Sequence, residues 1–153
     1  FDGRTTTWFS GAGLSDAAVR CVFEDQAGNL WFGNNGAGLF RYDGRSMRNV
    51  TEEKGLGNHP FLQERRVVDQ PGTLARVWSI TDDKAGNLWI GTIDAGVWRL
   101  TGNELTNYTT RDGLTGNSVW KVYKDRSGEL WFVTNGDSIC RFDGKSFKRM
   151  NFQ

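Results

Sequence analysis

The chain has 153 residues, and its 19 Lys and Arg against 18 Asp and Glu give a formal net charge of +1. This balance argues against a nucleic-acid partner, because such domains carry a clear basic excess that replaces phosphate counterions. No stretch approaches the ~20 apolar residues of a membrane-spanning helix, so we expect no membrane insertion in this segment. The 20 glycines and 2 prolines indicate many tight turns between short elements, which a helical bundle does not need.

Cysteine and histidine content limits the chemistry. Cys21 and Cys140 cannot make a dense disulfide framework, and no Cys or His cluster has metal-ligand spacing, so we predict neither a metal site nor a cofactor. His59, the only histidine, allows at most one Ser/His or Cys/His pair for nucleophilic catalysis. The chain begins at Phe1 rather than at Met, which is typical of a processed or excised segment.

The first predicted elements form a β-hairpin. Residues 19–23 and 30–32 are rich in β-branched and aromatic side chains, as strands are. The sequence DQAGN at residues 25–29 separates them, and it is a turn sequence because its aspartate can bond the turn and its glycine can adopt a positive φ.

Two further strands are predicted after the hairpin. A glycine-rich connection over residues 33–38 leads to a third strand at residues 39–42. Asp43-Gly44 then turns the chain into a fourth strand near residues 46–51, because Asp-Gly is among the strongest short hairpin signals.

A repeat organises the whole chain. Residues 21–42, 79–100 and 121–142 align without gaps, and the same four strands are predicted in each repeat. The Trp of a shared Leu-Trp pair recurs after 58 residues and then after 42, so the middle repeat carries 16 additional residues between Leu56 and Val77. Four short antiparallel strands in one such repeat match a β-propeller blade.

We therefore predict an all-β protein, a β-propeller segment with three four-stranded blades in one domain over residues 1–153. Residues 1–9 match the fourth-strand segment at residues 142–150, so the chain holds one outer strand too many. The predicted boundaries are the repeats at about 10–51, 52–108 and 109–152, the insertion at 57–76 and the surplus outer strand at 1–9.

The strings VxxVxxDxxGNLWFG and GLFRYDG resemble the two-component regulator propeller repeat, and the resemblance covers the chain except the insertion. The third repeat departs from it, with Glu129 in place of the Asn, Val133 in place of the Gly, and Asp137-Ser138 in place of a glycine-containing pair. The resemblance implies a signal-transduction role in a periplasmic or otherwise extracytoplasmic sensor region of a hybrid two-component system. In that family the repeat builds seven-bladed rings that often detect saccharides.

Three sets of residues recur in every repeat, and we interpret each set as structural. The aspartates of the turns lack the dense oxygen ligands of a calcium loop, so we expect them to close the turns. We expect the tryptophans of the Leu-Trp pairs to pack between blades, and the arginines of the third strands to reach a carboxylate or carbonyl. The members are Asp25, Asp83 and Asp125, then Trp31, Trp89 and Trp131, and then Arg41, Arg99 and Arg141.

The connections between second and third strands, and those between blades, differ among the repeats and lie on one face of a propeller. Binding residues concentrate on variable loops held by a rigid scaffold, so we predict the ligand site on this face. Trp78 and Trp120 occupy matching positions where an aromatic ring can stack on a sugar or, alternatively, fill the core beside the channel. The insertion is either a further part of the site or an ordinary surface loop. The candidate ligand-binding residues are Asn35, His59, Phe61, Arg65, Arg66, Trp78, Asp94, Trp120, Asn135 and Asp137.

Three functions remain open. The first is a non-catalytic ligand-binding sensor module, with a saccharide as the expected ligand. The second is a protein-interaction or self-assembly module. The third and least favoured is a glycoside hydrolase or lyase, for which Asp94 and Asp137 are the candidate carboxylates. We expect no enzymatic activity and assign no catalytic residue.

Three blades do not close a ring by themselves, because propellers typically have four to eight. We expect the apolar sides of the first and third blades, including Trp31 and Trp131, to need a partner. A two-fold homodimer would build a six-bladed ring, with residues 1–9 as a clasp on the partner. The alternative is that the chain is an excised part of a seven-bladed sensor.

Overall fold

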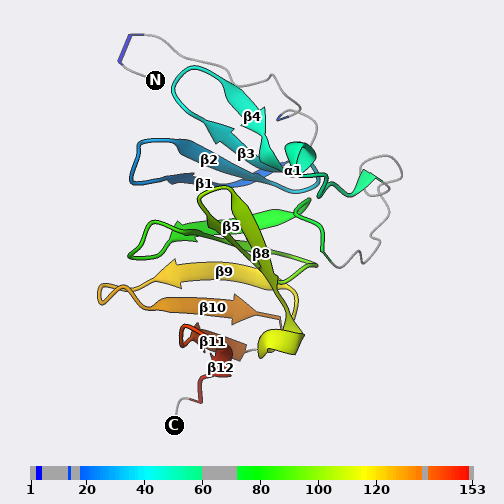
Figure 1. Cartoon of the computed structure of the whole chain (residues 1–153), viewed down its shortest axis with the longest axis vertical. Helices are drawn as coiled ribbons and strands as arrows, with labels where there is room; N and C mark the ends of the chain where they lie inside the picture. The colour runs from blue at the N-terminus through cyan, green and yellow to red at the C-terminus, as the bar shows by residue number, and fades with distance from the viewer. Residues whose placement is uncertain (1–2, 5–13, 15–17, 60–71, 136–137, 152–153) are drawn as a thin grey trace.

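The computed structural model describes residues 3–4, 14, 18–59, 72–135 and 138–151. These residues form three four-stranded antiparallel sheets, which lie one beside the next along the long axis of the molecule as three blades (Figure 1). The prediction of an all-β propeller segment with three blades is therefore confirmed. The predicted surplus strand at residues 1–9 lies outside the described residues, apart from residues 3 and 4.

The strands of each blade are hydrogen-bonded in chain order. Blade 1 consists of β1 (Val19–Glu24), β2 (Leu30–Asn34), β3 (Gly38–Tyr42) and β4 (Met47–Asn49). Blade 2 consists of β5 (Val77–Asp82), β6 (Leu88–Thr92), β7 (Val97–Thr101) and β8 (Glu104–Tyr108). Blade 3 consists of β9 (Val119–Lys124), β10 (Leu130–Thr134), β11 (Ser138–Phe142) and β12 (Phe147–Arg149). The first strands, β1, β5 and β9, contact one another from blade to blade and form the inner edge.

The outer strand of blade 1 is shorter than predicted. β4 ends at Asn49, and a short helix, α1 (Val50–Glu53), occupies the rest of the segment that we expected to be a strand. The Asn49 side chain accepts a hydrogen bond from the Glu52 backbone N–H at 3.1 Å. Asparagine is a favoured residue at this capping position, which explains why the strand gives way to a helix here.

The recurring aspartates close the hairpin turns, as predicted. Asp25 Oδ1 accepts hydrogen bonds from the backbone N–H groups of Ala27 and Asn29, at 3.0 and 2.9 Å. Gly28 has a φ of 81°, which only glycine adopts without strain. Asp25 Oδ2 also accepts the indole N–H of Trp31 at 2.8 Å, a bond that recurs from Trp89 to Asp83 and from Trp131 to Asp125. Each turn is therefore fastened to the tryptophan of its second strand.

The recurring arginines stabilise the blades, as predicted. The Arg41 guanidinium donates to the side-chain carbonyl of Asn29 at 3.0 Å and lies over the Trp31 ring. In blade 3 the residue at the Asn29 position is Glu129, and its carboxylate pairs with Arg141 at 2.8 Å. In the third repeat a carboxylate therefore replaces the amide, and it contacts the same arginine position.

Neighbouring blades are in close contact where the first valine of one blade packs on a glycine in the second strand of the preceding blade. A Cβ atom added to Gly33 in β2 would lie 2.6 Å from Cγ1 of Val77, the first residue of β5. A Cβ added to Gly91 in β6 would lie 3.0 Å from Cγ1 of Val119, the first residue of β9. A Cβ at Gly33 would also meet Cys21 Sγ of its own sheet, and a Cβ at Gly91 would force its neighbours to shift by a few tenths of an ångström, so close packing disfavours a side chain at either position.

Apolar side chains fill the space around each of these contacts. Between blades 1 and 2, Trp31 packs with Ile90 and Trp98, and all three side chains are buried. Between blades 2 and 3, Trp89 packs against Phe132 with ring centroids 5.6 Å apart. The prediction that the recurring tryptophans pack between blades is confirmed for Trp31 and Trp89, which are both buried.

We predict that the Asp125 turn makes stability depend on pH in the acid range. Hydrogen bonds from Ser127 and from Trp131 lower the pKa of Asp125 to about 2. The stabilisation is therefore complete above the unfolded-state pKa of about 3.9 and is lost as the pH falls toward the folded-state value. Asp125→Asn should unfold at a lower temperature than the wild-type protein at neutral pH, and the gap should close between about pH 4 and pH 2.

Thermal unfolding followed by circular dichroism across this pH range measures the gap. A difference between the two proteins that stays constant down to about pH 2 would show that the ionised carboxylate does not hold the turn.

Candidate functional site

The variable connections lie opposite the hairpin turns. In Figure 1 the β9–β10 turn lies at the left and α1, which leads into the insertion, lies at the right. The backbone N–H groups of Asn35, Ile93 and Asn135 donate to the carbonyls of the residues that precede β1, β5 and β9, respectively, at 2.9 to 3.1 Å. The β2–β3, β6–β7 and β10–β11 connections therefore share the face on which the inner strands begin.

Arg76 ties two of the predicted residues together on this face. Its Nε donates to the Asn35 side-chain oxygen at 3.2 Å, and a guanidinium nitrogen lies 3.5 Å from the Asp94 carboxylate. The Asp94 side chain is only 3% exposed and that of Arg76 14%. The three side chains thus form a nearly buried clamp that joins blade 1 to blade 2. Asp94 is engaged in this clamp and does not face solvent as a general acid or base would.

Arg76 was not among the predicted site residues. It is the last residue of the insertion and directly precedes β5. Ala18 and Ser118 precede β1 and β9 in the same way, so an arginine at this position is a departure from the repeat. This difference between the repeats is the feature of the sequence that could have identified Arg76 as a site residue.

A row of three side chains crosses the inner strands near their first residues. The Arg20 guanidinium carbon lies 4.9 Å from the centroid of the Trp78 ring. Trp78 and Trp120 meet edge to face, with centroids 5.0 Å apart and ring planes at 87°. Trp120 is 47% exposed, which is unusual for so large an apolar residue. Arg20 comes from β1, Trp78 from β5 and Trp120 from β9, so the row spans all three blades.

The other predicted residues lie apart from these two groups or outside the description. His59 lies beside Glu52, with 4.0 Å between Nε2 and the carboxylate, and its side chain is 66% exposed. The Asn135 backbone bonds the segment before β9, and a Cβ added to Gly116 would meet the Asn135 side-chain oxygen. Phe61, Arg65, Arg66 and Asp137 lie outside the described residues.

Hydrogen bonds close the base of the insertion. The backbone N–H of Leu74 donates to the Leu56 carbonyl at 2.8 Å, and the Thr51 hydroxyl donates to the Leu74 carbonyl at 2.9 Å. The Trp98 indole N–H donates to the Thr73 carbonyl at 3.0 Å. The insertion therefore leaves and re-enters the fold at a fixed point beside the clamp.

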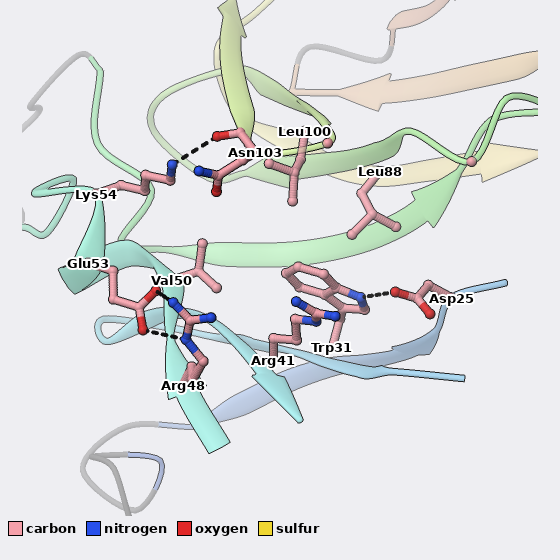
Figure 2. A pocket seen from close by; sticks show the side chains of 12 residues that line it. Asp25, Trp31, Arg41, Arg48, Val50, Glu53, Lys54, Leu88, Leu100 and Asn103 are labelled. Atoms are coloured by element: carbon pink, nitrogen blue, oxygen red, sulfur yellow. Dashed lines mark hydrogen bonds and ion pairs between the residues drawn. The ribbon is translucent and has the colours of Figure 1, made fainter. Parts of the chain in front are cut away.

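A cavity of about 230 Å³ lies between blades 1 and 2, on the side of Asp25 and Trp31 (Figure 2). Two guanidinium nitrogens of Arg48 bond the Glu53 carboxylate, each at 2.8 Å, and Lys54 bonds the Asn103 carbonyl. A matching cavity lies between blades 2 and 3, lined by the equivalent Asp83, Trp89 and Arg99. Because equivalent cavities lie at both joints between blades, we attribute them to the way that the blades pack and not to a particular ligand.

Within the described ranges, no three or more His, Cys, Asp and Glu side chains are grouped so that they could hold a metal ion. The helices of the described part of the chain are all too short or too polar to cross a membrane. Both cysteines are free thiols, and burial raises the pKa of Cys21 to about 11.

Comparison with known proteins gives a family and a fold. A family model described as two component regulator propeller matches residues 13–36, 71–94 and 113–136. The extracellular domain of a hybrid two-component system from B. thetaiotaomicron is 26% identical with a TM-score of 0.63, over 90% of this chain and 17% of that one. Virginiamycin B lyase from Staphylococcus aureus is 16% identical with a TM-score of 0.63, over 90% of this chain and 42% of that one.

PorZ from Porphyromonas gingivalis is a further similar structure, 18% identical with a TM-score of 0.55, over 84% of this chain and 18% of that one. The chain thus spans less than half the length of each of these structures. No curated protein matches the sequence. The likeness to the lyase and to PorZ extends to the propeller fold alone.

We predict that the Arg76 clamp is important for stability. Arg76→Ala should lower the free energy of unfolding by about 3–5 kcal/mol, because it removes the guanidinium that lies beside the buried Asp94 carboxylate. Adding Asp94→Ala to that variant should recover part of the loss, because the buried carboxylate is then removed as well.

Chemical denaturation of the wild-type protein, both single variants and the double variant completes a mutant cycle. Additive losses in this cycle would mean that the two side chains do not interact.

Proposed function

Because the chain belongs to the two-component regulator propeller family, we propose that it is a non-catalytic ligand-binding module of an extracytoplasmic sensor. The family match in all three repeats supports this proposal. So does the 26% identity to the extracellular domain of a hybrid two-component system. The chain would supply part of a propeller that recognises a ligand outside the cell, and the rest of the sensor would carry the signal.

The ligand that we propose is a saccharide, bound on the variable face over Trp120. The observation that carries the proposal is the exposed Trp120 ring, supported from the side by Trp78. A sugar presents a flat array of C–H groups that stacks on an indole, and its hydroxyls then need polar groups close by. Arg20, which lies against Trp78, is the polar group in the same row.

The arrangement of the two indoles suits this role. Trp78 packs edge to face against Trp120, with the ring planes at 87°, and this contact restricts the orientation of the Trp120 ring. The Arg20 guanidinium in turn lies over the Trp78 ring. A ring that is fixed before binding loses little conformational entropy when a ligand stacks on it, which favours affinity.

Catalysis is the less favoured alternative. Lyases share the fold at 16 to 19% identity, and one of those structures is a catalytically inactive histidine-to-alanine variant. The one histidine of this chain, His59, lies beside Glu52 at the base of the insertion. Asp94, one of the two candidate carboxylates, is held in the Arg76 clamp.

We predict that a glycan array will yield a saccharide ligand and that Trp120→Ala will weaken its binding at least about tenfold, as the loss of a central tryptophan commonly does. Trp120→Phe should retain much of the affinity, because a flat apolar ring remains. Tyr42→Ala is a matched control, since Tyr42 is a partly exposed aromatic beside the β3–β4 turn on the opposite face.

Isothermal titration calorimetry with the strongest hit measures the affinities, and chromatography of the same mixture after incubation detects any product. An array without a hit, or a Trp120→Ala variant that binds like the wild-type protein, would refute the saccharide site. Turnover of the ligand would replace the sensor proposal with the catalytic one.

A further inference from the structure

The three residues of the row, Arg20, Trp78 and Trp120, each occupy a β-bulge in an inner strand. In blade 1 the pairing of β1 with β2 shifts between Val19 and Cys21, so Arg20 has no opposite residue on β2. The same shift falls at Trp78 in β5 and at Trp120 in β9. A bulge re-aims the side chain of its extra residue, and bulges are frequent beside functional sites. The repeat therefore builds this position in every blade, and the residue type at the bulge differs between blade 1 and the other two.

The residue types at the bulges determine what the row can recognise. An indole offers a flat apolar face to a sugar ring of any charge. A guanidinium instead presents paired N–H donors that fit two oxygens of an anionic group. Two blades contribute an indole and one contributes a guanidinium, so the row combines a stacking surface with a site for an anion.

The N–H donors of Arg20 are available to a ligand. Within the described part of the chain, Arg20 makes neither a hydrogen bond nor an ion pair, and its guanidinium lies over the Trp78 ring. The arginines of the third strands differ, because each bonds or pairs with a side chain of its own blade. Those arginines are Arg41, Arg99 and Arg141, with Asn29, Asp83 and Glu129 as their partners. Arg20 is therefore a cation that the contacts within the fold do not neutralise.

The charges around the row favour an anion. Burial raises the pKa of Cys21 to about 11, and the ammonium of Lys121, an exposed residue of β9, is near enough to act in the opposite direction. The Asp94 carboxylate on this face is held in the clamp and is only 3% exposed. Glu24 and Asp82, the carboxylates of the inner strands, end β1 and β5, four residues beyond the bulges. Four residues of strand span roughly 13 Å, which exceeds the Debye length of ~8 Å at physiological salt.

We propose that the row binds an acidic saccharide, with a sugar ring on Trp120 and a carboxylate or sulfate group of the same ligand on Arg20. This inference rests on the proposed function and adds the charge of the ligand to it. The Arg20 guanidinium carbon and the Trp120 ring centroid lie 4.9 and 5.0 Å from the Trp78 centroid, so one oligosaccharide can reach both. Blades beyond this chain would add their own residues at the same strand position.

Matched pairs of ligands test the charge directly. A glycan array should present uronate-bearing oligosaccharides beside their carboxyl-reduced counterparts, and sulfated oligosaccharides beside their desulfated counterparts. The acidic member of a pair should bind at least about tenfold more tightly than the neutral one, because hydrogen bonds to charged groups are the stronger kind. The two kinds of pair distinguish a carboxylate from a sulfate. Affinity for the acidic member should also fall between about 50 and 500 mM salt.

Variants separate the cation from the stacking surface. Arg20→Gln should remove the preference for the acidic member and leave the affinity for the neutral member unchanged, whereas Arg20→Lys should retain part of the preference. Trp120→Ala should weaken both members, because both stack on the ring. Arg45→Gln is the matched control, since it removes an exposed arginine from the β3–β4 turn on the opposite face. Circular dichroism confirms that each variant is folded.

Isothermal titration calorimetry with the best pair from the array measures these affinities. The inference is overturned if the two members of every pair bind equally, or if Arg20→Gln and Arg45→Gln have the same effect on the acidic member. In either case a loss of affinity in Trp120→Ala would leave the proposed saccharide site standing without its preference for an anion. An array without a hit would refute that site, and the inference would fail with it.

Discussion

The close contact of a valine with a glycine sets the spacing of the blades. Val77 lies on Gly33 and Val119 lies on Gly91, and a single added methyl group would disturb either contact. This spacing lets the tryptophans of one sheet pack into the next and places the first residues of the inner strands within reach of one another. The row of Arg20, Trp78 and Trp120 exists because the strands that carry these side chains are held this close.

The residues that all three repeats share are used in building the blades. The carboxylate of each turn binds the turn and an indole, and the indoles of Trp31 and Trp89 lie between sheets and beneath a guanidinium. Chemistry beyond folding is therefore left to positions where the repeats differ. The inner-strand row is one such group, with an arginine in one blade and tryptophans in the other two. The clamp around Arg76 is another, but its burial indicates a structural role that fixes the variable face.

The sequence predicted the fold well because its signals are local. An aspartate three residues before a glycine in a turn, and a Leu-Trp pair after it, describe a hairpin without reference to the rest of the chain. What depended on neighbouring blades was harder to predict. The sequence around Gly33 does not indicate that Val77, more than 40 residues later, packs on it. Nor does the sequence around Arg76 indicate that its side chain contacts Asn35 and Asp94. Asn49 ended a strand early because capping a helix competes with continuing the strand.

The most direct test of this account is the free energy of unfolding of Gly91→Val, which places in an internal joint the residue that blade 3 has at position 133. A Cβ at Gly91 would lie 3.0 Å from Cγ1 of Val119 and 3.2 Å from its carbonyl oxygen, so the valine cannot be accommodated without parting the sheets. Chemical denaturation should show a loss of about 1–3 kcal/mol, part of which Val119→Ala recovers in the double variant. A loss below about 0.5 kcal/mol, the size of an ordinary surface substitution, would contradict the claim that this contact sets the spacing of the blades.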